Sequence, residues 1–312
     1  MVIEDAVISV VVLTYNSDLK KLFATLRSII CQKKVCFEVI ITDDGTKQFD
    51  ENMVIDFFEK NNFSQYKILQ STENVGIVKN YIRGLEVAKG EWIYGISPGD
   101  MLYDPDVLFD FLQFARTSNA DFCFGNPQYY SLNDSQIITY NLKTPSYPKL
   151  YKKGKYKTSF KLRGILTGQN ILGAAYFRKR KLMLDYLHQI EGKIKYLEDR
   201  PTAALCILDG HNLFYYDRDC IWYEFGTGVS TSVSSISPRI QNDIVEMEKL
   251  LEEKSPNNRI IRTYRQSKIR NVWKQPIISL LFIYIRVREK WIFHKKCGNI
   301  SLKYLKQFLN QR

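Results

Sequence analysis

The sequence predicts an α/β protein with a mainly parallel central sheet that is flanked by helices. The first observation is that the apolar runs Ile8–Leu13 and Phe37–Thr42 are continuous and rich in β-branched residues, as in strands buried on both faces. The second is that apolar residues recur at helical spacing between them, from Leu19 to Ile30. Strands that alternate with helices form a parallel sheet with helices on both faces.

The same alternation continues through the first 115 residues. Two further strands are expected at Tyr66–Leu69 and Glu91–Ile96. Three further helices are expected at Met53–Lys60, Gly76–Ala88 and Pro105–Ala115. This order is that of repeated strand–helix units, so the active crevice is expected at the carboxyl ends of the strands.

The remainder of the chain has a weaker pattern. Strands and loops are expected over Tyr129–Thr158, a return strand over Gly173–Lys179, and a helix near Pro201, since proline suits a first helical turn. Phe225–Ser235 is a Gly/Ser-rich loop. Beyond Ile240 the pattern is helical, with interruptions at Ser255–Asn258 and Pro276.

The composition indicates one large folded domain with an extension. The 312 residues are 45% hydrophobic, which supplies a sizeable core and argues against disorder. The net charge is +12, but residues 259–312 hold fourteen Lys/Arg and one acid, so the first 258 residues carry a net charge of −1. We therefore predict a catalytic domain over residues 1–240 and a helical, basic, amphipathic extension over residues 241–312.

The N-terminus and the cysteines point to the cytoplasm. Acidic residues stand at the start, where a signal peptide would carry basic ones, so the first apolar run is interpreted as a core strand. The six cysteines have no CxxC spacing, and free thiols are expected in place of disulfides or a zinc site.

Polar motifs follow three of the predicted strands. They are Thr14–Asn16, Asp43–Gly45 and Ser97–Asp100. Because the carboxyl ends of parallel strands meet at one edge of a sheet, these motifs are expected to line a common crevice. Their residue types suit a glycosyl donor, whose transfer requires a nucleotide pocket, charge neutralisation at a departing diphosphate and a base for the acceptor hydroxyl.

Five pieces in order resemble family 2 glycosyltransferases, which have the GT-A fold. They are VVVLTYN (Val10–Asn16), VIITDDGT (Val39–Thr46), NVGIVKNYIRGLEVAKGEWI (Asn74–Ile93), SPGD (Ser97–Asp100) and the pair Glu198–Asp199. The resemblance is dense from Ile8 to Asp106 and sparse to about Ser232. It implies a nucleotide-sugar donor, a divalent cation (Mg²⁺ or Mn²⁺) and an acceptor deprotonated by a carboxylate.

The resemblance also implies a nucleotide-binding set. Thr14, with its neighbours Tyr15 and Asn16, and Asp44, with its neighbour Asp43, match the positions that line the nucleotide pocket. A strand-to-loop turn is the alternative interpretation of the two aspartates. Lys79 stands where the family usually has arginine and would meet the diphosphate, although an ordinary solvated helix lysine would look the same.

The SPGD motif departs from the family pattern. The family has two acids in a DxD motif, and here Pro98 occupies the first acidic position. Asp100 matches the second, metal-binding acid, and Gly99 precedes it in the donor site. One carboxylate, the diphosphate and water can still hold Mg²⁺ or Mn²⁺, which predicts a weaker, donor-dependent metal site. A Pro-Gly turn beside an aspartate is the alternative.

Glu198–Asp199 resembles the family's catalytic ED pair. The resemblance implies that Asp199 deprotonates the acceptor hydroxyl in an inverting displacement, while Glu198 supports it. A helix start just beyond the pair would favour the carboxylate form. An N-cap role for Asp199 is the alternative, and the two roles are compatible.

The basic extension predicts contact with a membrane surface. The apolar run Pro276–Ile285 is too short to span a bilayer, and a cluster of Lys/Arg with Trp291 follows it. Such a segment suits a surface-lying helix on anionic lipid. A helix packed on the body is the first alternative. Nucleic acid is the second, but no RNA- or DNA-binding motif is present, so no nucleic-acid partner is expected.

Together these features predict an inverting, metal-assisted hexosyltransferase of cell-surface polysaccharide synthesis. The expected donor is a UDP-sugar and the expected acceptor a lipid-linked saccharide at the cytoplasmic face of the membrane. A catalytically silent GT-A module that scaffolds a polysaccharide complex is the alternative function, because the first DxD acid is missing.

Overall fold

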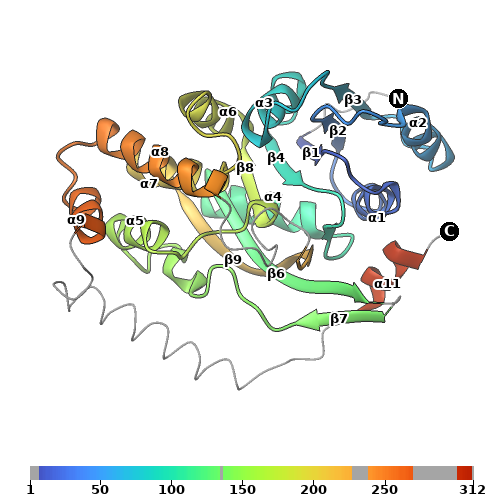
Figure 1. The fold of residues 1–312 in the computed structure, drawn as a ribbon. Coiled ribbons are helices and arrows are strands. Elements are labelled where there is room, and N and C mark those ends of the chain that lie inside the picture. The colour runs from blue at the N-terminus through green and yellow to red at the C-terminus, as the bar shows by residue number, and fades with distance from the viewer. Residues whose placement is uncertain (1–6, 134–135, 227–237, 270–300, 311–312) are drawn as a thin grey trace.

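The strands and helices of the N-terminal third alternate as predicted, apart from one additional two-residue strand at Met101–Leu102. The computed structural model describes residues 7–133, 136–226, 238–269 and 301–310 (Figure 1). Up to residue 118 the elements are β1 (Ile8–Thr14), α1 (Leu19–Ile30), β2 (Phe37–Asp43), α2 (Glu51–Lys60), β3 (Tyr66–Gln70), α3 (Ile77–Val87), β4 (Trp92–Ile96), β5 (Met101–Leu102) and α4 (Val107–Ser118). Helix α2 begins two residues earlier than predicted because Asp50 caps it, accepting a hydrogen bond from the Met53 amide.

The second half of the chain completes the sheet and adds most of the remaining helices. Its elements are β6 (Phe122–Asn133), β7 (Gln136–Tyr140), η1 (Pro148–Tyr151), α5 (Thr158–Leu166), η2 (Gly173–Ala175), β8 (Tyr176–Lys179), α6 (Arg180–Ile190), α7 (Asp199–Leu208), β9 (Leu213–Glu224), α8 (Pro238–Lys254), α9 (Arg259–Ile269) and α11 (Lys303–Asn310). The return strand predicted from Gly173 begins only at Tyr176, after a 3₁₀ turn. The helix predicted near Pro201 begins at Asp199.

The nine strands of the described residues form one sheet. Its order is β3-β2-β1-β4-β8-β6-β9-β5, and β7 pairs with β6 outside this path. Strands β3, β2, β1 and β4 are parallel, with Val10 opposite Val39 on one side and Tyr94 on the other. Strand β8 is antiparallel to both β4 and β6, so the second half of the sheet is mixed. The parallel half holds the predicted strand-end motifs.

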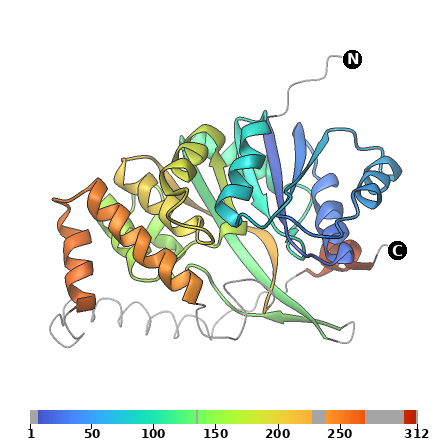
Figure 2. The ribbon, with the colours of Figure 1, turned by 45° about the horizontal axis from the view of Figure 1, so that its top comes forward.

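Helices cover both faces of the sheet, as Figure 2 shows. Alternate residues of β1 face opposite layers. Val10 and Val12 pack into the cluster that contains residues of α1, α2 and α4, whereas Val11 packs into the cluster of α3, α5, α6 and α7. The fold is therefore an α/β/α arrangement built around the buried strands that the sequence predicted.

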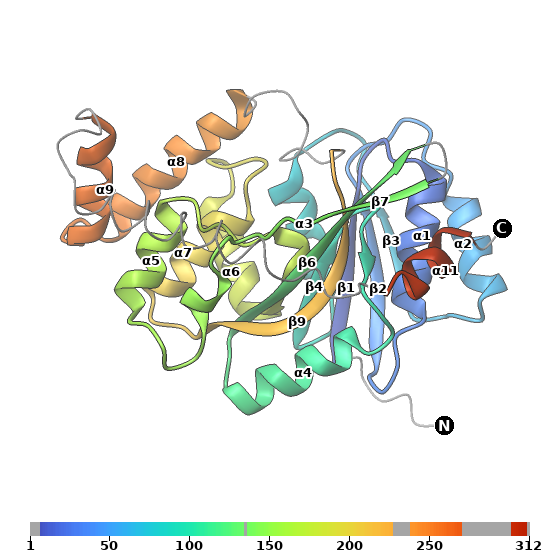
Figure 3. The ribbon, with the colours of Figure 1, turned by 90° about the horizontal axis from the view of Figure 1, so that it is seen from below.

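The C-terminal part packs on the body wherever it is described. Helix α8 places Met247 and Leu251 in the larger core cluster, and α9 follows it across the predicted interruption at Ser255–Asn258. Helix α11 lies against α1 (Figure 3), where Leu305 and Phe308 are buried and Arg27 Nε donates to the Phe308 carbonyl at 2.7 Å.

Several predictions about the extension fall outside the described residues. These include the apolar run Pro276–Ile285 and the cluster of basic residues after it. No helix in the described ranges is both long enough and apolar enough to cross a bilayer. No disulfide joins any two of the five cysteines in those ranges. The division at residue 240 stays a prediction.

Candidate active site

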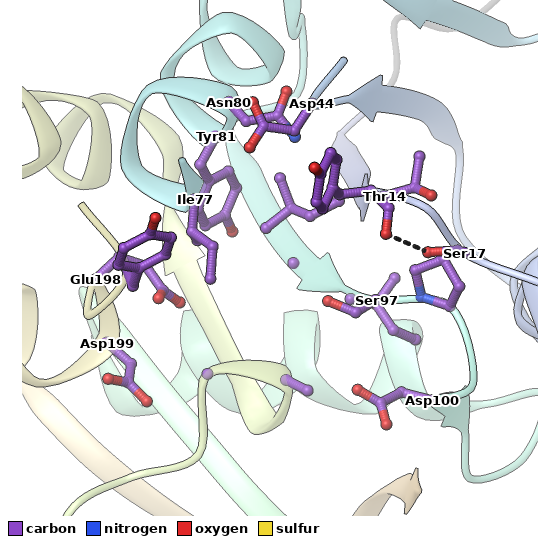
Figure 4. Close-up of a pocket in the computed structure, with 18 of the residues that line it drawn as sticks. Thr14, Ser17, Asp44, Ile77, Asn80, Tyr81, Ser97, Asp100, Glu198 and Asp199 are labelled. Carbon is purple, nitrogen blue, oxygen red and sulfur yellow. Dashed lines mark hydrogen bonds between the residues drawn. The ribbon is translucent and has the colours of Figure 1, made fainter. Parts of the chain in front are cut away.

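The carboxyl ends of the parallel strands open onto one pocket. Its cavity volume is about 390 Å³, and it is lined by five of the residues predicted for the site, namely Thr14, Tyr15, Asp44, Asp100 and Asp199. Figure 4 shows Asp44, Asp100 and the pair Glu198–Asp199 on separate sides of this pocket. The fold thus brings together Asp44, Asp100 and Asp199, of which the first and the last are 155 residues apart along the chain.

Asp44 joins the end of β2 to the start of α3. Its two carboxylate oxygens accept hydrogen bonds from the backbone amides of Val75 and Gly76, at 2.8 and 2.9 Å, and its own amide donates to the Thr14 carbonyl at 2.9 Å. Burial raises the pKa of Asp44, while these two amides and the charges of Lys195 and Arg83 oppose the shift. The side chain therefore fixes the pocket wall and still borders the cavity.

Asp43 and Asn16 hold the loop beside the pocket and are not among the residues that line it. Asp43 is fully buried, and its carboxylate accepts hydrogen bonds from the hydroxyl and the amide of Thr46 at 2.6 and 2.7 Å. The Asn16 amide donates to the same Thr46 hydroxyl at 2.7 Å. Both residues shape the β1 and β2 ends, and their predicted contact with the nucleotide stays a prediction.

Lys79 and Gly99 also lie outside the pocket lining. Lys79 is exposed on α3, where it has no ion pair within the described residues. The next residue, Asn80, is buried and donates to the Thr42 carbonyl at 2.8 Å, so it secures α3 to the sheet. Gly99 has φ 100° and lies so close to the Glu224 carboxylate that a Cβ would clash with it.

Asp100 is a buried carboxylate with few partners. It is 6% exposed, and its Oδ1 accepts one hydrogen bond, from the Glu224 amide at 3.0 Å. No described residue hydrogen-bonds to its Oδ2. Burial raises the pKa of Asp100 well above its usual range, and the negative charge of Glu224 adds to the shift. A nearby cation would favour the charged form.

Glu224 is a site residue that the sequence analysis missed. It ends β9, lines the same pocket and brings a second carboxylate beside Asp100. Lys21 Nζ lies 2.7 and 2.8 Å from the two Glu224 carboxylate oxygens. The only sequence signal was an acid at the end of the apolar run that precedes Phe225–Ser235, and nothing in its spacing links it to Asp100.

Glu198 and Asp199 form a coupled acidic pair. Burial raises the pKa of Glu198 to about 7, and the charge of Asp199 adds to this shift. Burial also raises the pKa of Asp199. The buried guanidinium of Arg178 opposes both shifts, and it is held by its Nη2, which donates to the Gly173 carbonyl at 3.2 Å. Asp199 is the first residue of α7 and not its N-cap, so the capping alternative does not describe it.

A clamp from α8 holds the loop that leads to this pair. The buried carboxylate of Asp243 accepts hydrogen bonds from three successive backbone amides, those of Lys195, Tyr196 and Leu197, at 3.2, 2.7 and 3.0 Å. Tyr196 and Leu197 line the pocket. The position of Glu198–Asp199 therefore depends on a residue about 45 positions later in the chain.

The described residues offer hard oxygen ligands but no complete metal cage. Within them no group of three or more His, Cys, Asp or Glu side chains is placed to hold a metal ion. Asp100, with an Oδ2 free of hydrogen bonds from described residues, and the neighbouring Glu224 fit a cation whose other ligands come from a substrate or water.

The fold is that of the GT-A class of nucleotide-sugar transferases. In this class the strand ends of a parallel half-sheet form one pocket, and a mixed half of the sheet adds further carboxylates. Solved structures of Staphylococcus aureus TarS, residues 1–349, have this fold. The complex with UDP-GlcNAc superposes with a TM-score of 0.56 at 20% identity over 80% of this chain and 66% of that one. The complex with UDP has a TM-score of 0.51 at 16% identity, covering 86% of this chain and 77% of that one.

The chain belongs to glycosyl transferase family 2. The family profile matches residues 9–182, more than half of the chain. An uncharacterized glycosyltransferase of Synechocystis is 28% identical over 105 residues, which is 33% of this chain and 32% of the relative. This chain therefore spans about one third of that relative, and the part that matches lies within a glycosyltransferase.

Proposed function

We propose that the protein transfers a sugar from a UDP-sugar to a hydroxyl of a lipid-linked saccharide, with inversion at the anomeric carbon. The observation that carries the proposal is the single pocket that joins Thr14 and Asp44 to Asp100 and Asp199. A donor nucleotide at the first pair would place its diphosphate toward Asp100. The acceptor hydroxyl would then approach from the side of Asp199.

In this scheme Asp199 is the general base. A base must be ionised when the acceptor binds, and Arg178 favours the ionised form of the pair against the effect of burial. The raised pKa of Glu198, about 7, means that one proton can stay on the pair near neutral pH. Glu198 would thus reduce the repulsion that a second charge imposes on Asp199.

Asp100 would hold Mg²⁺ or Mn²⁺, with Glu224 beside it as a second carboxylate that is paired with Lys21. The bound cation supplies neutralisation of the charge that develops on the leaving diphosphate. Asp44 and Thr14, with Tyr15 nearby, would contact the nucleotide. Lys79, Gly99, Asn16 and Asp43 border this region and keep their predicted donor-side roles as proposals.

The proposed acceptor places the protein at the cytoplasmic face of a membrane. Its support is the sequence of residues 259–312, where fourteen Lys/Arg accompany a single acid. Such a segment is attracted to anionic lipid at about 1 kcal/mol for each basic residue near the surface. A lipid-linked substrate would make this attraction useful.

Steady-state kinetics of the purified protein and its variants test the assignment of the base. We expect turnover of a UDP-sugar with Mn²⁺, and a fall in kcat/KM of about 10²–10⁴-fold in Asp199→Asn with donor binding retained. Glu86→Gln, on the exposed surface of α3, is a matched control that removes a carboxylate far from the chemistry. Unchanged turnover in Asp199→Asn would exclude Asp199 as the base.

A silent GT-A module is the second candidate, favoured by Pro98 in place of the first DxD acid. Calorimetry with UDP, with and without Mn²⁺, separates the two. The enzyme should bind UDP more tightly when Mn²⁺ is present, and Asp100→Asn should abolish that difference. A module without catalytic function should show no Mn²⁺-dependent binding.

A further inference from the structure

A second, larger cavity lies on the other side of the Ser97–Asp100 turn. Its volume is about 1240 Å³, and it is walled by α1, the end of α2, the β6–β7 hairpin and α11. We call this cavity the α1–α11 groove. Figure 3 shows α11 beside α1. Gly99 and Glu224 line the groove, and Glu224 lines the active pocket as well, so the two cavities are neighbours.

The groove is strongly basic. Its lining includes five cationic side chains, Lys20, Lys21, Arg27, Lys60 and Lys306, and one carboxylate, that of Glu224. Lys21 pairs with Glu224, and Arg27 donates to the Phe308 carbonyl. The other three, Lys20, Lys60 and Lys306, are exposed and have no acidic partner among the described residues. The groove therefore presents uncompensated positive charge.

The walls between these cations are apolar. Phe23 of α1 stacks on Phe57 of α2 with ring centroids 5.1 Å apart. Helix α11 turns Leu305 and Phe308 into the core, while Leu302, Lys306 and Leu309 line the groove. On the hairpin, Leu132 is 45% exposed. Apolar walls with lysines among them match an amphiphile with an anionic head.

We infer that the α1–α11 groove binds anionic phospholipid of a membrane surface, with phosphate at Lys20, Lys60 and Lys306 and the start of the acyl chains against the apolar walls. Charge argues against the chain's own residues 270–300 as the occupant, because they carry seven Lys/Arg and one acid. The purpose of this lipid site rests on the proposed function. Lipid bound in the α1–α11 groove would hold the mouth of the active pocket at the bilayer that carries the acceptor.

Vesicle binding by the full chain tests the inference. The variant Lys20→Gln/Lys60→Gln/Lys306→Gln is compared with Lys89→Gln/Lys157→Gln/Lys181→Gln, which removes the same charge from exposed lysines elsewhere. On vesicles of phosphatidylcholine with about 30% phosphatidylglycerol, we expect the groove variant to lose at least about tenfold in partition coefficient. The control should lose less than about threefold. An equal loss in both, or no loss in either, overturns the inference.

A second variant tests the apolar walls. At about 0.5 M salt, where exposed charges are screened, Leu132→Ser should lower the remaining vesicle binding by about threefold or more. No change would overturn the apolar contact. Loss of RNA-oligonucleotide binding in the groove variant, with vesicle binding intact, would assign the groove to nucleic acid and overturn the inference.

UDP titration of the same proteins separates this inference from the proposed function. The groove variants should bind UDP as the wild type does, since none of the three lysines lines the active pocket. Wild type that binds vesicles through the groove but does not bind UDP would refute the proposed function alone. Wild type that binds UDP but shows no groove-dependent vesicle binding would refute the lipid site alone.

Discussion

Glu198→Gln should stabilise the protein at pH 8. The folded protein raises the pKa of this carboxyl from 4.5 to about 7, chiefly through burial. A group whose pKa is raised on folding contributes stability that is fully present below its unfolded pKa and lost as pH rises through its folded pKa. The wild type should therefore lose stability between about pH 4.5 and pH 7, whereas a glutamine of similar shape carries no such dependence.

The shift sets the size of the effect. The difference between 4.5 and about 7, at 1.36 kcal/mol for each pH unit, corresponds to about 3 kcal/mol. Because the carboxyl borders the pocket, solvent screening reduces this to about 2–3 kcal/mol. Glu198→Gln should thus raise the free energy of unfolding by about 2–3 kcal/mol at pH 8 and by less than about 1 kcal/mol at pH 4.5.

Urea unfolding at the two pH values measures both quantities. Glu86→Gln, which removes an exposed glutamate from α3, should show no difference between pH 4.5 and pH 8. Equal effects of Glu198→Gln at both pH values would refute the reasoning, because the stabilisation would then have a cause other than ionisation. A loss of stability at pH 8 would show that the charged form is favoured by the fold.

Three further predictions concern the supports of the site. Asp243→Ala leaves three backbone amides without their buried acceptor and should lower the free energy of unfolding by about 3–5 kcal/mol, measured by thermal or urea unfolding. Asp243→Asn should lower it by about half as much. A decrease below about 1 kcal/mol would mean that water replaces the Asp243 carboxylate as acceptor. Arg178→Met removes the charge that lowers the pKa of Glu198 and Asp199, so the acidic limb of the pH–kcat/KM profile should move up by about 1–2 pH units; an unmoved limb would contradict the assigned base. Phe308→Ala should lower the free energy of unfolding by about 2–4 kcal/mol. If α11 detaches instead, proteolysis after Lys303 and Lys306 should become severalfold faster. Unchanged stability together with an unchanged digest would contradict the docking of α11.

The N-terminal half of the fold could be predicted because its signals are local. Strand β1 is a continuous β-branched run, and α1 repeats apolar residues at helical spacing. The pattern within about ten residues is therefore enough to predict each element. Parallel strands then bring their polar ends to one edge regardless of the loops between them. For this reason Thr14, Asp44 and Asp100 were predicted together and line one pocket.

The other contacts of the site depend on long-range pairing. Glu224 lies beside Asp100 because β9 pairs with β5, and Met101 of β5 is opposite Trp222. Arg178 reaches Glu198 and Asp199 because β8 runs antiparallel to β4. No short pattern records which strands pair across more than 80 residues, and the burial that shifts these pKa values is a property of the folded core.

The same limit explains the residues that were placed beside the pocket and not in its lining. Asp43 is the last residue of β2 and Asp44 is the next residue along the chain, but successive residues of an extended chain point in opposite directions, and the Asp43 carboxylate turns to Thr46. Lys79 is in the first turn of α3, whose buried side includes Val78 and Asn80, so its own side chain faces solvent. Motif matching identifies the segment, and side-chain direction decides the contact.

The Asp243 clamp also limits where the polypeptide can be truncated. A polypeptide ending at residue 240, the boundary that composition suggests, would keep every strand of the sheet and all five predicted residues of the pocket, yet it would release the loop that carries Glu198–Asp199. Such a fragment could retain the nucleotide side of the pocket and lose the acceptor side. Truncated variants and chimaeras of this protein should therefore keep α8 together with the sheet.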